Sequence, residues 1–365
     1  MTQPDPSSLP GLRNAIDALD DEVLALLNRR AGLAAEVGRL KAEAAPETLF
    51  HAPKREREVL ARLEAANPGP FPSAAIRTVF QEIMSACLSL EKPLRVAFLG
   101  PEGTFTHLAA RHQFGGSCQS LPQGTIPAVF QAVERGRADY GVVPVENATE
   151  GAVDSTLDAF LDSPLRICAE ILLPVDQALL LRPGLDLGSV RRVYSHPQAL
   201  GQCRRWLEAN LSRADRIEAP STSEAARLAR EDAEGAAVAS ELAAELFGLQ
   251  VAEPRIQDLA ANATRFLVLG RKPSDPTGWD RTSLVVLAQD GPGALLRLLE
   301  PLARRGLNLS RIQSRPTRRR VWEYAFFLDV EGHADDAPLA AALADLKGVC
   351  ASLKVLGSYP RAGER

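Results

Sequence analysis

Two cations lie on the apolar side of a predicted N-terminal helix. Residues eleven positions apart lie only about 20° apart around an α-helix, so Arg30 and Lys41 share one face. The apolar members of that face are Val23, Leu26, Ala34 and Val37. Cations among apolar side chains are costly unless an anion neutralises them. The spacing therefore indicates either an anion-binding site or two side chains that extend to a helix end or meet acids of neighbouring helices.

Arg13 belongs to the same predicted helix but points elsewhere. By the same geometry it lies roughly 100° away from Arg30 around the helix axis. We therefore expect Arg13 to reach an anion held by Arg30 and Lys41 only from another copy of the chain.

A second candidate site precedes a predicted buried strand, FLVLG, at residues 266–270. The stretch NATRF places Asn262, Thr264 and Arg265 at the mouth of that strand. Polar side chains at such a place suggest that something polar is bound there. The alternative is a threonine that caps a loop. For an isolated Thr-Arg-Phe, this structural interpretation would be favoured.

The elements that must position these side chains fall into three segments. Residues 1–92 show helical spacing only, which predicts an all-α domain. Residues 93–272 alternate predicted strands and helices, which predicts an α/β domain with room for two lobes around a cleft. Residues 280–361 follow the order β-α-β-β-α-β of a ferredoxin-like α+β domain. The predicted helices of the first segment cover residues 12–45, 53–66 and 73–91.

The 365-residue chain has an ordinary globular composition and a formal net charge of −4 at pH 7. This mild acidity argues against general nucleic-acid binding. The five cysteines are scattered without CxxC spacing, so we expect neither a disulfide framework nor a zinc site, and a cytoplasmic location. The sequence shows no signal peptide, no apolar run of membrane-spanning length and no phosphate-binding loop, so we expect no membrane partner and no cofactor.

The stretches LRNAIDALDDEVLALLNRRAGLAAEVGRLK, PKREREVL and FQEIMSACLSLE resemble the helical chorismate mutase family over about residues 10–92. The resemblance implies an intertwined helical dimer that rearranges chorismate to prephenate. Chorismate carries two carboxylates, which suit several guanidinium groups through paired, charge-assisted hydrogen bonds. The site residues that the resemblance implies are Arg30, Lys41, Arg55, Glu56, Cys87 and Glu91, joined by Arg13 of the second subunit.

This rearrangement needs neither a nucleophile nor a proton transfer. The enzyme has to fold the substrate and stabilise charge on the breaking ether oxygen. Lys41 is the donor implied on one side, and Glu91 stands on the other side, where many relatives carry glutamine. An ionised glutamate would repel that oxygen, so we expect Glu91 to act in its protonated form. Mutase activity should then fall as pH rises, and Glu91→Gln should flatten the profile.

The motifs GPEGTFTHLAA, GVVPVENATEGAV, YSHPQALGQC and NATRFLVLG resemble prephenate dehydratase, in the order typical of that family. The resemblance implies two α/β lobes, similar to periplasmic binding proteins, with the active site in the cleft between them. Prephenate there loses carbon dioxide and hydroxide together, driven by aromatisation. Thr264 is implied as the donor to the leaving hydroxyl, in a preorganised and partly desolvated site. The residues expected to bind prephenate are Thr104, Thr106, Glu146, Asn147, Ser195, Gln198, Gln202 and Arg265.

Several of these residues have a structural alternative. Glu146 and Asn147 follow the apolar VVPV at a strand end, where acids and amides also serve as helix caps. The threonines of PEGTFTH either bind a carboxylate near a helix N-terminus or cap that helix. Gln198 and Gln202 are one helical turn apart, so both can face one ligand.

The C-terminal segment, from about residue 281 to 360, resembles an ACT domain of the phenylalanine-sensing type through GPGALLRLLEPLARRGLNLSRIQSRP and WEYAFFLD. The resemblance implies an effector site between paired domains, where glycines let the backbone approach the ligand. Phenylalanine bound there would stabilise a less active arrangement of the dehydratase lobes. The implied effector-binding residues are Gly293, Ala294, Leu295, Leu296, Ser314, Arg315 and Pro316.

Together the three resemblances imply a bifunctional, homodimeric enzyme that turns chorismate into phenylpyruvate under feedback by phenylalanine. Two alternatives stay open at this point. One is a non-enzymatic amino-acid sensor that uses the cleft as a ligand-binding module. The other is a dehydratase whose helical domain serves only for dimerisation.

Overall fold

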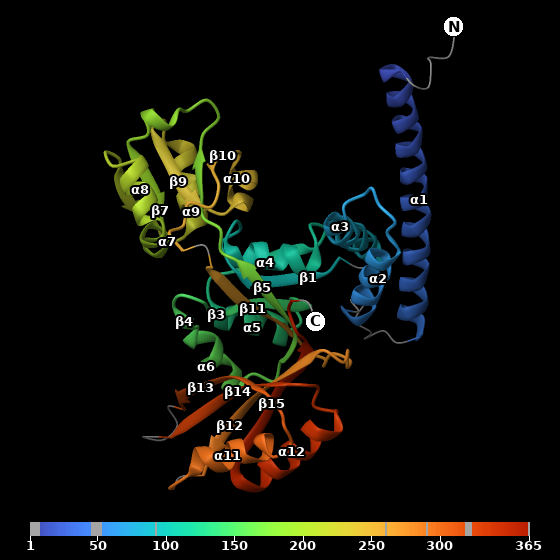
Figure 1. Ribbon diagram of the computed structural model, residues 1–365, viewed down its shortest axis with the longest axis vertical. Helices are drawn as coiled ribbons and strands as arrows, with labels where there is room; N and C mark the ends of the chain where they lie inside the picture. The colour runs from blue at the N-terminus through green and yellow to red at the C-terminus, as the bar shows by residue number, and fades with distance from the viewer. Residues whose placement is uncertain are drawn as a thin grey trace. The chain divides into compact units, whose positions relative to one another are not determined.

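The computed structural model describes residues 8–44, 53–91, 93–259, 261–289, 291–317 and 323–363, with the backbone alone at positions 42, 44, 53, 54 and 91. The chain divides into two units. A helical unit comprises residues 1–94 together with 114–119, and the second unit comprises the remaining residues. Figure 1 shows the helices of the first unit in blue and the sheets of the second unit in colours from teal to red.

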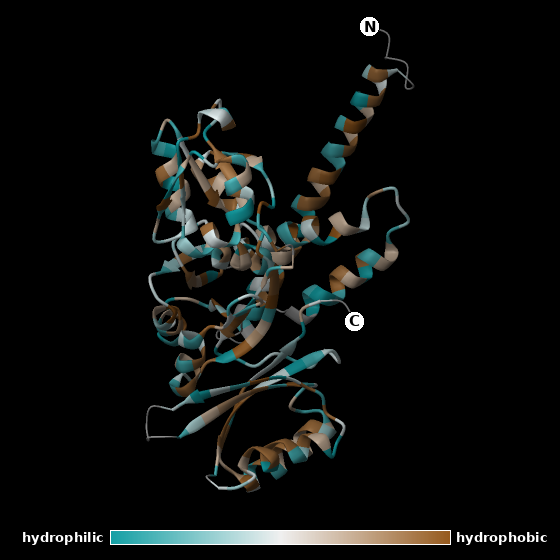
Figure 2. Ribbon diagram, turned by 60° about the vertical axis from the view of Figure 1, so that its left-hand side comes forward, coloured by the Kyte–Doolittle hydropathy of each residue, from teal (hydrophilic) through white to brown (hydrophobic). Residues whose placement is uncertain are grey.

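The helical unit consists of α1 (Leu9–Ala44), α2 (Pro53–Ala66) and α3 (Ser73–Glu91), which confirms the predicted all-α segment. α3 packs against both α1 and α2. A helix of 36 residues gains most of its stability by packing an apolar face, yet large apolar side chains along α1 are exposed. Figure 2 shows hydrophobic residues, in brown, at intervals along this helix. The exposed apolar residues of α1 are Leu9, Leu12, Ile16, Leu19, Val23, Leu24, Leu26, Leu33, Val37 and Leu40.

A short segment from the predicted α/β domain also belongs to the helical unit. The N–H of Gly116 donates to both carboxylate oxygens of Glu82 in α3, at 3.2 and 3.0 Å. The N–H of Ser117 donates to the hydroxyl oxygen of Ser85, also in α3, at 3.3 Å. Residues 114–119 are therefore held by α3 although they follow the predicted boundary after residue 92.

The first lobe of the second unit is built on a mixed sheet with the strand order β2-β1-β3-β11-β5, and β4 pairs with β3. β1 and β3 are parallel, whereas β11 runs antiparallel to both β3 and β5. The elements of this lobe are β1 (Arg95–Leu99), α4 (Phe105–Phe114), β2 (Gln119–Gln123), α5 (Ile126–Glu134), β3 (Tyr140–Asn147), β4 (Gly151–Ala152), α6 (Asp154–Asp162), β5 (Arg166–Pro174) and β11 (Ala263–Gly270).

The second lobe is inserted between β5 and β11, so the chain crosses between the lobes twice. Its sheet has the order β10-β6-β9-β7-β8. One apolar cluster around Leu207 and Val238 covers one face, and a second cluster around Ala226 and Ala237 covers the other. Its elements are β6 (Ala178–Leu181), β7 (Arg192–Ser195), α7 (Pro197–Gln202), α8 (Arg204–Asn210), β8 (Asp215–Glu218), α9 (Thr222–Glu231), β9 (Gly235–Ala239), α10 (Glu241–Phe247) and β10 (Gln250–Glu253).

The C-terminal segment has the predicted β-α-β-β-α-β order and forms a four-stranded sheet, β13-β14-β12-β15. Helices α11 and α12 pack on one face of it, around Leu284, Leu298 and Leu346. The elements are β12 (Asp280–Ala288), α11 (Ala294–Ala303), β13 (Leu309–Pro316), β14 (Tyr324–Glu331), α12 (Ala337–Val349) and β15 (Cys350–Pro360).

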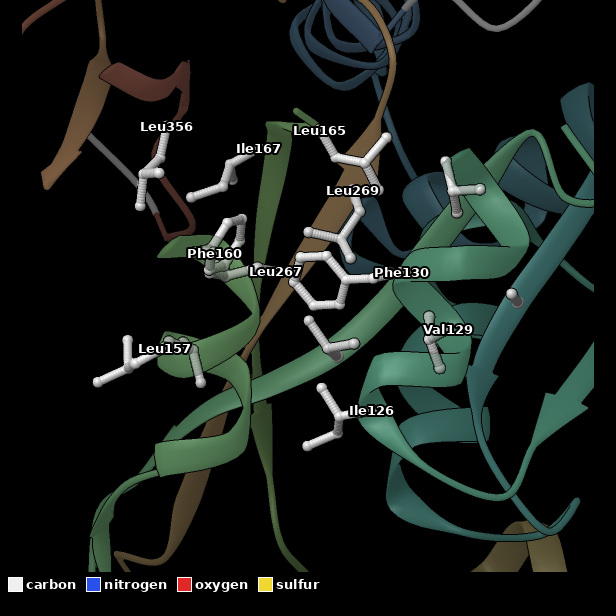
Figure 3. Close-up of a cluster of buried hydrophobic side chains, with 14 of the residues drawn as sticks. Ile126, Val129, Phe130, Leu157, Phe160, Leu165, Ile167, Leu267, Leu269 and Leu356 are labelled. Atoms are coloured by element: carbon white, nitrogen blue, oxygen red, sulfur yellow. The ribbon is translucent and has the colours of Figure 1, made fainter. Parts of the chain in front are cut away.

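The other face of this sheet shares one hydrophobic core with the first lobe. Successive side chains of a strand point to opposite faces, so Leu284 of β12 faces the helices while Val285 faces the first lobe. Leu356 of β15 lies in the same buried cluster as Phe160 and Ile167 of the first lobe (Figure 3). The first lobe and the C-terminal sheet are therefore packed as one body.

Candidate active sites

Thr264 lies at the start of β11, where the chain returns from the second lobe. The register of the sheet places Thr264 beside Asn147 at the end of β3. Only 8% of Thr264 is exposed, so its hydroxyl group is largely removed from water. Asn147 Nδ2 donates a hydrogen bond to Thr264 Oγ1 at 2.7 Å. Residues from two separate sequence motifs are thus in direct contact.

Hydrogen bonds fix the side-chain amide of Asn147 in one orientation. Its Oδ1 accepts from the N–H and the hydroxyl of Thr149, at 3.0 and 2.6 Å, and from the N–H of Glu150 at 3.2 Å. Its Nδ2 therefore faces β11 and acts as the donor to Thr264. Because Thr264 Oγ1 accepts this bond, the hydroxyl hydrogen remains available to donate. Donation to a leaving hydroxyl group requires this arrangement.

A cavity of about 490 Å³ lies between the two lobes next to this pair, a size that suits a small metabolite. Gln198 and Gln202, predicted one helical turn apart, both line it. Asn262 lines it too, and its Oδ1 accepts from Asn147 Nδ2 at 3.2 Å. The residues that line the cavity are Thr149, Glu150, Gln198, Gly201, Gln202, Arg205, Gln257, Asp258, Leu259 and Asn262.

Neither Thr264 nor the other six predicted prephenate-binding residues are among those that line this cavity, and three of the six have structural roles. Ser195 is fully buried and donates its hydroxyl to the carbonyl oxygen of Val238 at 2.6 Å. Thr104 accepts from the N–H of His107 at 3.3 Å, as a residue that caps α4 does. Thr106 is buried in the same helix. Their part in substrate binding stays a prediction.

Glu146 and Arg265 lie on the opposite face of the first lobe's sheet from Thr264. Arg265 pairs in register with Glu146, as Thr264 does with Asn147, and adjacent residues of a strand point to opposite faces. Glu146 forms an ion pair with Arg311 of β13 at 3.0 Å. The structure therefore does not bring Glu146 and Arg265 to the cavity between the lobes, because side chains alternate between the two faces of a strand.

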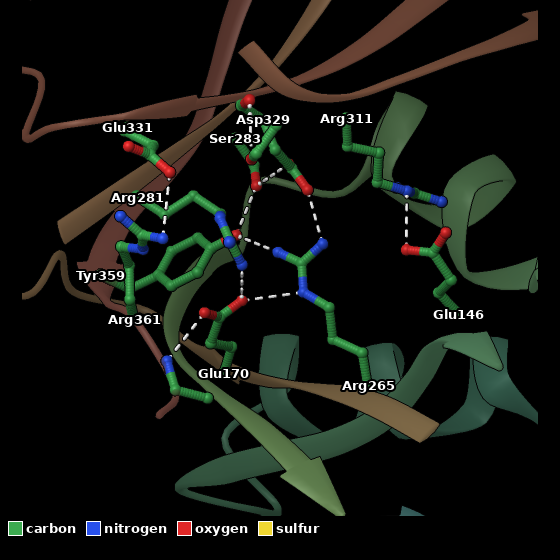
Figure 4. A network of polar contacts seen from close by, with 12 residues as sticks. Glu146, Glu170, Arg265, Arg281, Ser283, Arg311, Asp329, Glu331, Tyr359 and Arg361 are labelled. Atoms are coloured by element: carbon green, nitrogen blue, oxygen red, sulfur yellow. Dashed lines mark hydrogen bonds and ion pairs between the residues drawn. The ribbon is translucent and has the colours of Figure 1, made fainter. Parts of the chain in front are cut away.

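Arg265 is held in a buried polar network between the first lobe and the C-terminal sheet (Figure 4). Its Nε donates to Glu170 at 2.8 Å, its Nη1 to Asp329 at 2.5 Å and its Nη2 to the Tyr359 hydroxyl at 2.9 Å. Arg281 pairs with the same Glu170. Arg265 thus connects β11 to β14 and β15.

The network sets the protonation of its buried members. Burial alone would raise the pKa of Asp329, but the Arg265 guanidinium and the Ser283 hydroxyl outweigh burial and lower the pKa. Burial, together with the negative charge of Asp329, raises the pKa of Tyr359. Asp329 is therefore ionised and Tyr359 neutral. The Asp329 carboxylate and the Tyr359 hydroxyl oxygen each accept a hydrogen bond from Arg265.

The helical unit places the predicted chorismate-binding residues in unlike surroundings. Arg30 is half-buried, and its Nη1 is buried without a hydrogen-bond partner among the described residues. Lys41 is half-buried and Cys87 is buried. Arg55 is exposed and pairs with Glu58 at 3.3 Å. A guanidinium nitrogen that is buried and unpaired favours an anion from outside the described part of the chain.

Arg13, Glu56 and Glu91 are the remaining predicted members of this site. Arg13 is exposed on α1, and a spacing of seventeen residues puts it about 25 Å from Arg30 along the helix axis. Glu56 is half-buried in α2. The side chain of Glu91, predicted as the second donor to the ether oxygen, lies outside the described residues. The roles of these residues stay predictions.

The predicted effector-binding residues divide between the two faces of the C-terminal sheet. Gly293, before α11, has a φ of 72°, in the left-handed region that favours glycine. Arg315 faces the first lobe, where it pairs with Asp154 at 2.6 Å and Asp158 at 2.9 Å in α6. Arg315 is therefore separated from the other predicted effector residues. Those others are partly or fully exposed: Ala294, Leu295, Leu296, Ser314 and Pro316.

Of the ten residues that line the cavity, only Gln198 and Gln202 were predicted as ligands, and two of the other eight had a signal in the sequence. Asn262 stands two positions before Thr264, and the period of an extended chain puts both on one face. Arg205 follows Gln198 and Gln202 at helical spacing, although the helix breaks at Cys203 between α7 and α8. The spacing of both residues was thus a usable signal.

Neither a membrane span nor a metal centre is found in the part of the chain that the structure describes. No described helix has the length and apolar character needed to cross a bilayer. No three described His, Cys, Asp or Glu residues are grouped as metal ligands.

Family models match the chain in the order of these segments. Chorismate mutase type II matches residues 12–92, prephenate dehydratase matches residues 96–274, and the ACT domain matches residues 282–348.

Relatives of known sequence or structure cover most of the chain. A bifunctional chorismate mutase/prephenate dehydratase of Aquifex aeolicus is 47% identical over 358 residues, which are 97% of this chain and 98% of the relative. The crystal structure of prephenate dehydratase from Arthrobacter aurescens in complex with L-Phe is 39% identical, with a TM-score of 0.68 over 73% of this chain and 90% of that chain. A structure described as a novel type of quorum quenching acylase, GqqA, is 34% identical, with a TM-score of 0.68 over 73% of this chain and 98% of that chain. The chain belongs to the bifunctional chorismate mutase/prephenate dehydratase family.

Proposed function

We propose that Thr264 and Asn147 form the centre of the dehydratase site in a bifunctional enzyme whose helical unit carries the mutase site. The enzyme rearranges chorismate to prephenate and converts prephenate to phenylpyruvate, with feedback inhibition by phenylalanine. The observation that carries the dehydratase assignment is the 2.7 Å hydrogen bond from Asn147 Nδ2 to Thr264 Oγ1 beside the cavity between the lobes.

The dehydratase reaction breaks two bonds of prephenate together. The electrons of the bond to the ring carboxylate move into the ring as carbon dioxide leaves, and the ring expels hydroxide as it becomes aromatic. The Thr264 hydroxyl donates to the departing oxygen, and Asn147 holds Thr264 in the orientation that allows this. A preorganised donor in a desolvated site stabilises charge that develops in the transition state.

Gln198 and Gln202 are the predicted prephenate ligands that the cavity supports directly. Glu146 and Arg265 act indirectly in this proposal. They fix β3 and β11 from the far side of the sheet through Arg311 and the buried network. Ser195 acts within the second lobe, where its hydroxyl joins β7 to β9, and Thr104 acts at the start of α4.

The mutase reaction requires only that the substrate be folded and that charge on the ether oxygen be stabilised. Lys41 supplies a donor to that oxygen, and Arg30, with its unpaired buried Nη1, binds a carboxylate. Arg55, Glu56, Cys87 and Glu91 complete the proposed site, together with Arg13 of a second copy. We propose a homodimer because the exposed apolar stripe of α1 needs a cover and because Arg13 has no route to Arg30 within one chain.

Phenylalanine acts through the ACT domain in this proposal. Gly293, Leu296 and Ser314 belong to its binding site, and Arg315 transmits the bound state to α6 through Asp154 and Asp158. Cytoplasmic location is a further proposal, supported by five cysteines that are all free.

The test follows the two products separately after the purified protein is mixed with chorismate. We expect prephenate to form and then phenylpyruvate, and Thr264→Ala to accumulate prephenate while the mutase rate stays unchanged. Phenylpyruvate formed only from added prephenate would limit the helical unit to dimerisation. Unchanged prephenate turnover in Thr264→Ala would remove Thr264 from the site.

A further inference from the structure

The cavity between the lobes has one cationic side chain among its described lining residues, Arg205 of α8. Prephenate is a dianion, and anions are bound most strongly by charge-assisted hydrogen bonds. The arginine beside Thr264 is not available, because Arg265 is engaged by Glu170 and Asp329 on the far face of the sheet. The charge that attracts the substrate must therefore come from another residue.

Arg205 is placed to supply that charge. Its backbone N–H donates to both carboxylate oxygens of Asp258, at 3.2 Å each, which fixes its main chain on the cavity wall. The guanidinium of Arg205 has no ion-pair partner among the described residues, whereas that of its neighbour Arg204 pairs with Glu208 at 2.8 Å.

Asn262 provides a second, independent sign of a missing ligand. It is only 3% exposed and lines the same cavity. Its Oδ1 accepts from Asn147, but its Nδ2 is buried without a hydrogen-bond partner among the described residues. A buried donor without an acceptor destabilises the folded protein, so such groups in native structures point to an unseen partner.

We propose that Arg205, assisted by Asn262 Nδ2, binds the pyruvyl carboxylate of prephenate. The proposal rests on the dehydratase function proposed above and names the charged contact of that site. The choice between the two carboxylates follows from the reaction. A guanidinium on the ring carboxylate would stabilise the group that must leave as carbon dioxide, and would oppose its departure. The pyruvyl carboxylate keeps its charge throughout, so a cation bound to it holds the substrate at no cost to the reaction.

This assignment predicts a property of the product. Phenylpyruvate retains the pyruvyl carboxylate and lacks the ring carboxylate. Arg205 therefore binds product as well as substrate, and both affinities depend on it in the same way.

The experiment compares Arg205→Gln with Arg204→Gln in the full-length enzyme. We expect Arg205→Gln to raise the KM for prephenate roughly tenfold or more, as loss of a charge-assisted bond implies, with kcat changed much less. The inhibition constant of phenylpyruvate should rise by the same factor, and Arg205→Lys should restore part of both. Arg204→Gln should match the wild type, and a kcat of Arg205→Gln close to that of the wild type shows that its dehydratase lobe is folded.

A KM for Arg205→Gln within twofold of the wild type overturns the proposal. A raised KM with unchanged inhibition by phenylpyruvate also overturns it, because the contact would then be to the ring carboxylate. Asn262→Asp retains the acceptor used by Asn147 and removes the free donor, so it should raise the KM further. Failure of the dehydratase function itself gives a different result, since the wild type would then make no phenylpyruvate from prephenate.

Discussion

In the proposed dehydratase mechanism, Asn147 orients the hydroxyl group of Thr264. The amide donates to Oγ1 at 2.7 Å and so directs the hydroxyl hydrogen away from β3. In Asn147→Asp the carboxylate would accept that hydrogen, and the donor would be lost to the substrate. We expect kcat for prephenate to fall by roughly 10²-fold with a smaller change in KM, as for removal of one transition-state donor. Steady-state kinetics measures this, with Thr264→Ser as the variant that keeps the hydroxyl. A kcat within twofold of the wild type would contradict the role of Asn147.

His107 makes the stability of the second unit depend on pH. Its ring stacks on Phe98 with 4.6 Å between centroids, and its Nδ1 accepts from the N–H of Gly103 at 3.1 Å. Burial lowers the pKa of His107 and outweighs the charge of Glu102, which acts in the opposite direction. The unfolded chain therefore binds more protons than the folded chain below pH 6.5, and the free energy of unfolding should fall as pH drops from 7 to 5.

Denaturant unfolding at several pH values checks this expectation. His107→Asn keeps an acceptor near the position of Nδ1 and does not titrate in this range. The variant should be less stable at pH 7 but should show a smaller decrease toward pH 5. An equal pH dependence in both proteins would assign the effect to other groups.

At the scale of elements, the two faces of β13 have different proposed functions. Ser314 and Pro316 are exposed on the proposed effector face. Arg311 and Arg315 point the other way and pair with Glu146 and with the acids of α6. If bound phenylalanine displaced β13, the Arg311 ion pair would move Glu146, which is the sequence neighbour of Asn147.

Arg311→Gln tests this coupling. We expect phenylalanine to bind still but to inhibit dehydratase activity less, because the link from β13 to the end of β3 is weakened. Glu146→Gln should have the same effect, and the double variant should add little to either single one. Arg304→Gln is the matched control, since Arg304 caps the C-terminal end of α11 and pairs with the exposed Glu300. Full inhibition in Arg311→Gln would place the coupling elsewhere, with Arg315 as the remaining link.

The same elements show what the sequence was able to predict. Helical spacing found α1, and the apolar run FLVLG found β11, because both patterns depend on local periodicity. Gln198 and Gln202 reached the cavity as their one-turn spacing required. Arg265 was placed in the same site as Thr264 because both belong to one motif. Adjacent residues of a strand point to opposite faces, which already argued against a shared site. The partners of Arg265 lie 64 to 95 residues away in sequence, and no local pattern identifies them.

At the scale of the whole molecule, a mutase site shared between two copies predicts subunit complementation. Arg13 and Lys41 would then act in one site but come from different chains, so Arg13→Ala and Lys41→Ala each inactivate every site of their own homodimer. A dimer of one variant with the other has one site that carries both substitutions and one site that carries neither. Random pairing makes half of the dimers mixed, each with one intact site of two, so co-expression should restore about a quarter of the wild-type mutase rate.

The dehydratase rate provides the internal control, because neither substitution touches the second unit, and it should be equal in all preparations. Arg39→Gln is a matched variant on α1, since Arg39 is exposed and pairs with Glu43 at 2.6 Å. It should leave the mutase rate unchanged. When co-expressed with either inactive variant, it should give the same mutase rate as the wild-type chain does. If the co-expressed Arg13→Ala and Lys41→Ala chains recover no activity, each site lies within one chain, and the exposed stripe of α1 would need another explanation than a shared active site.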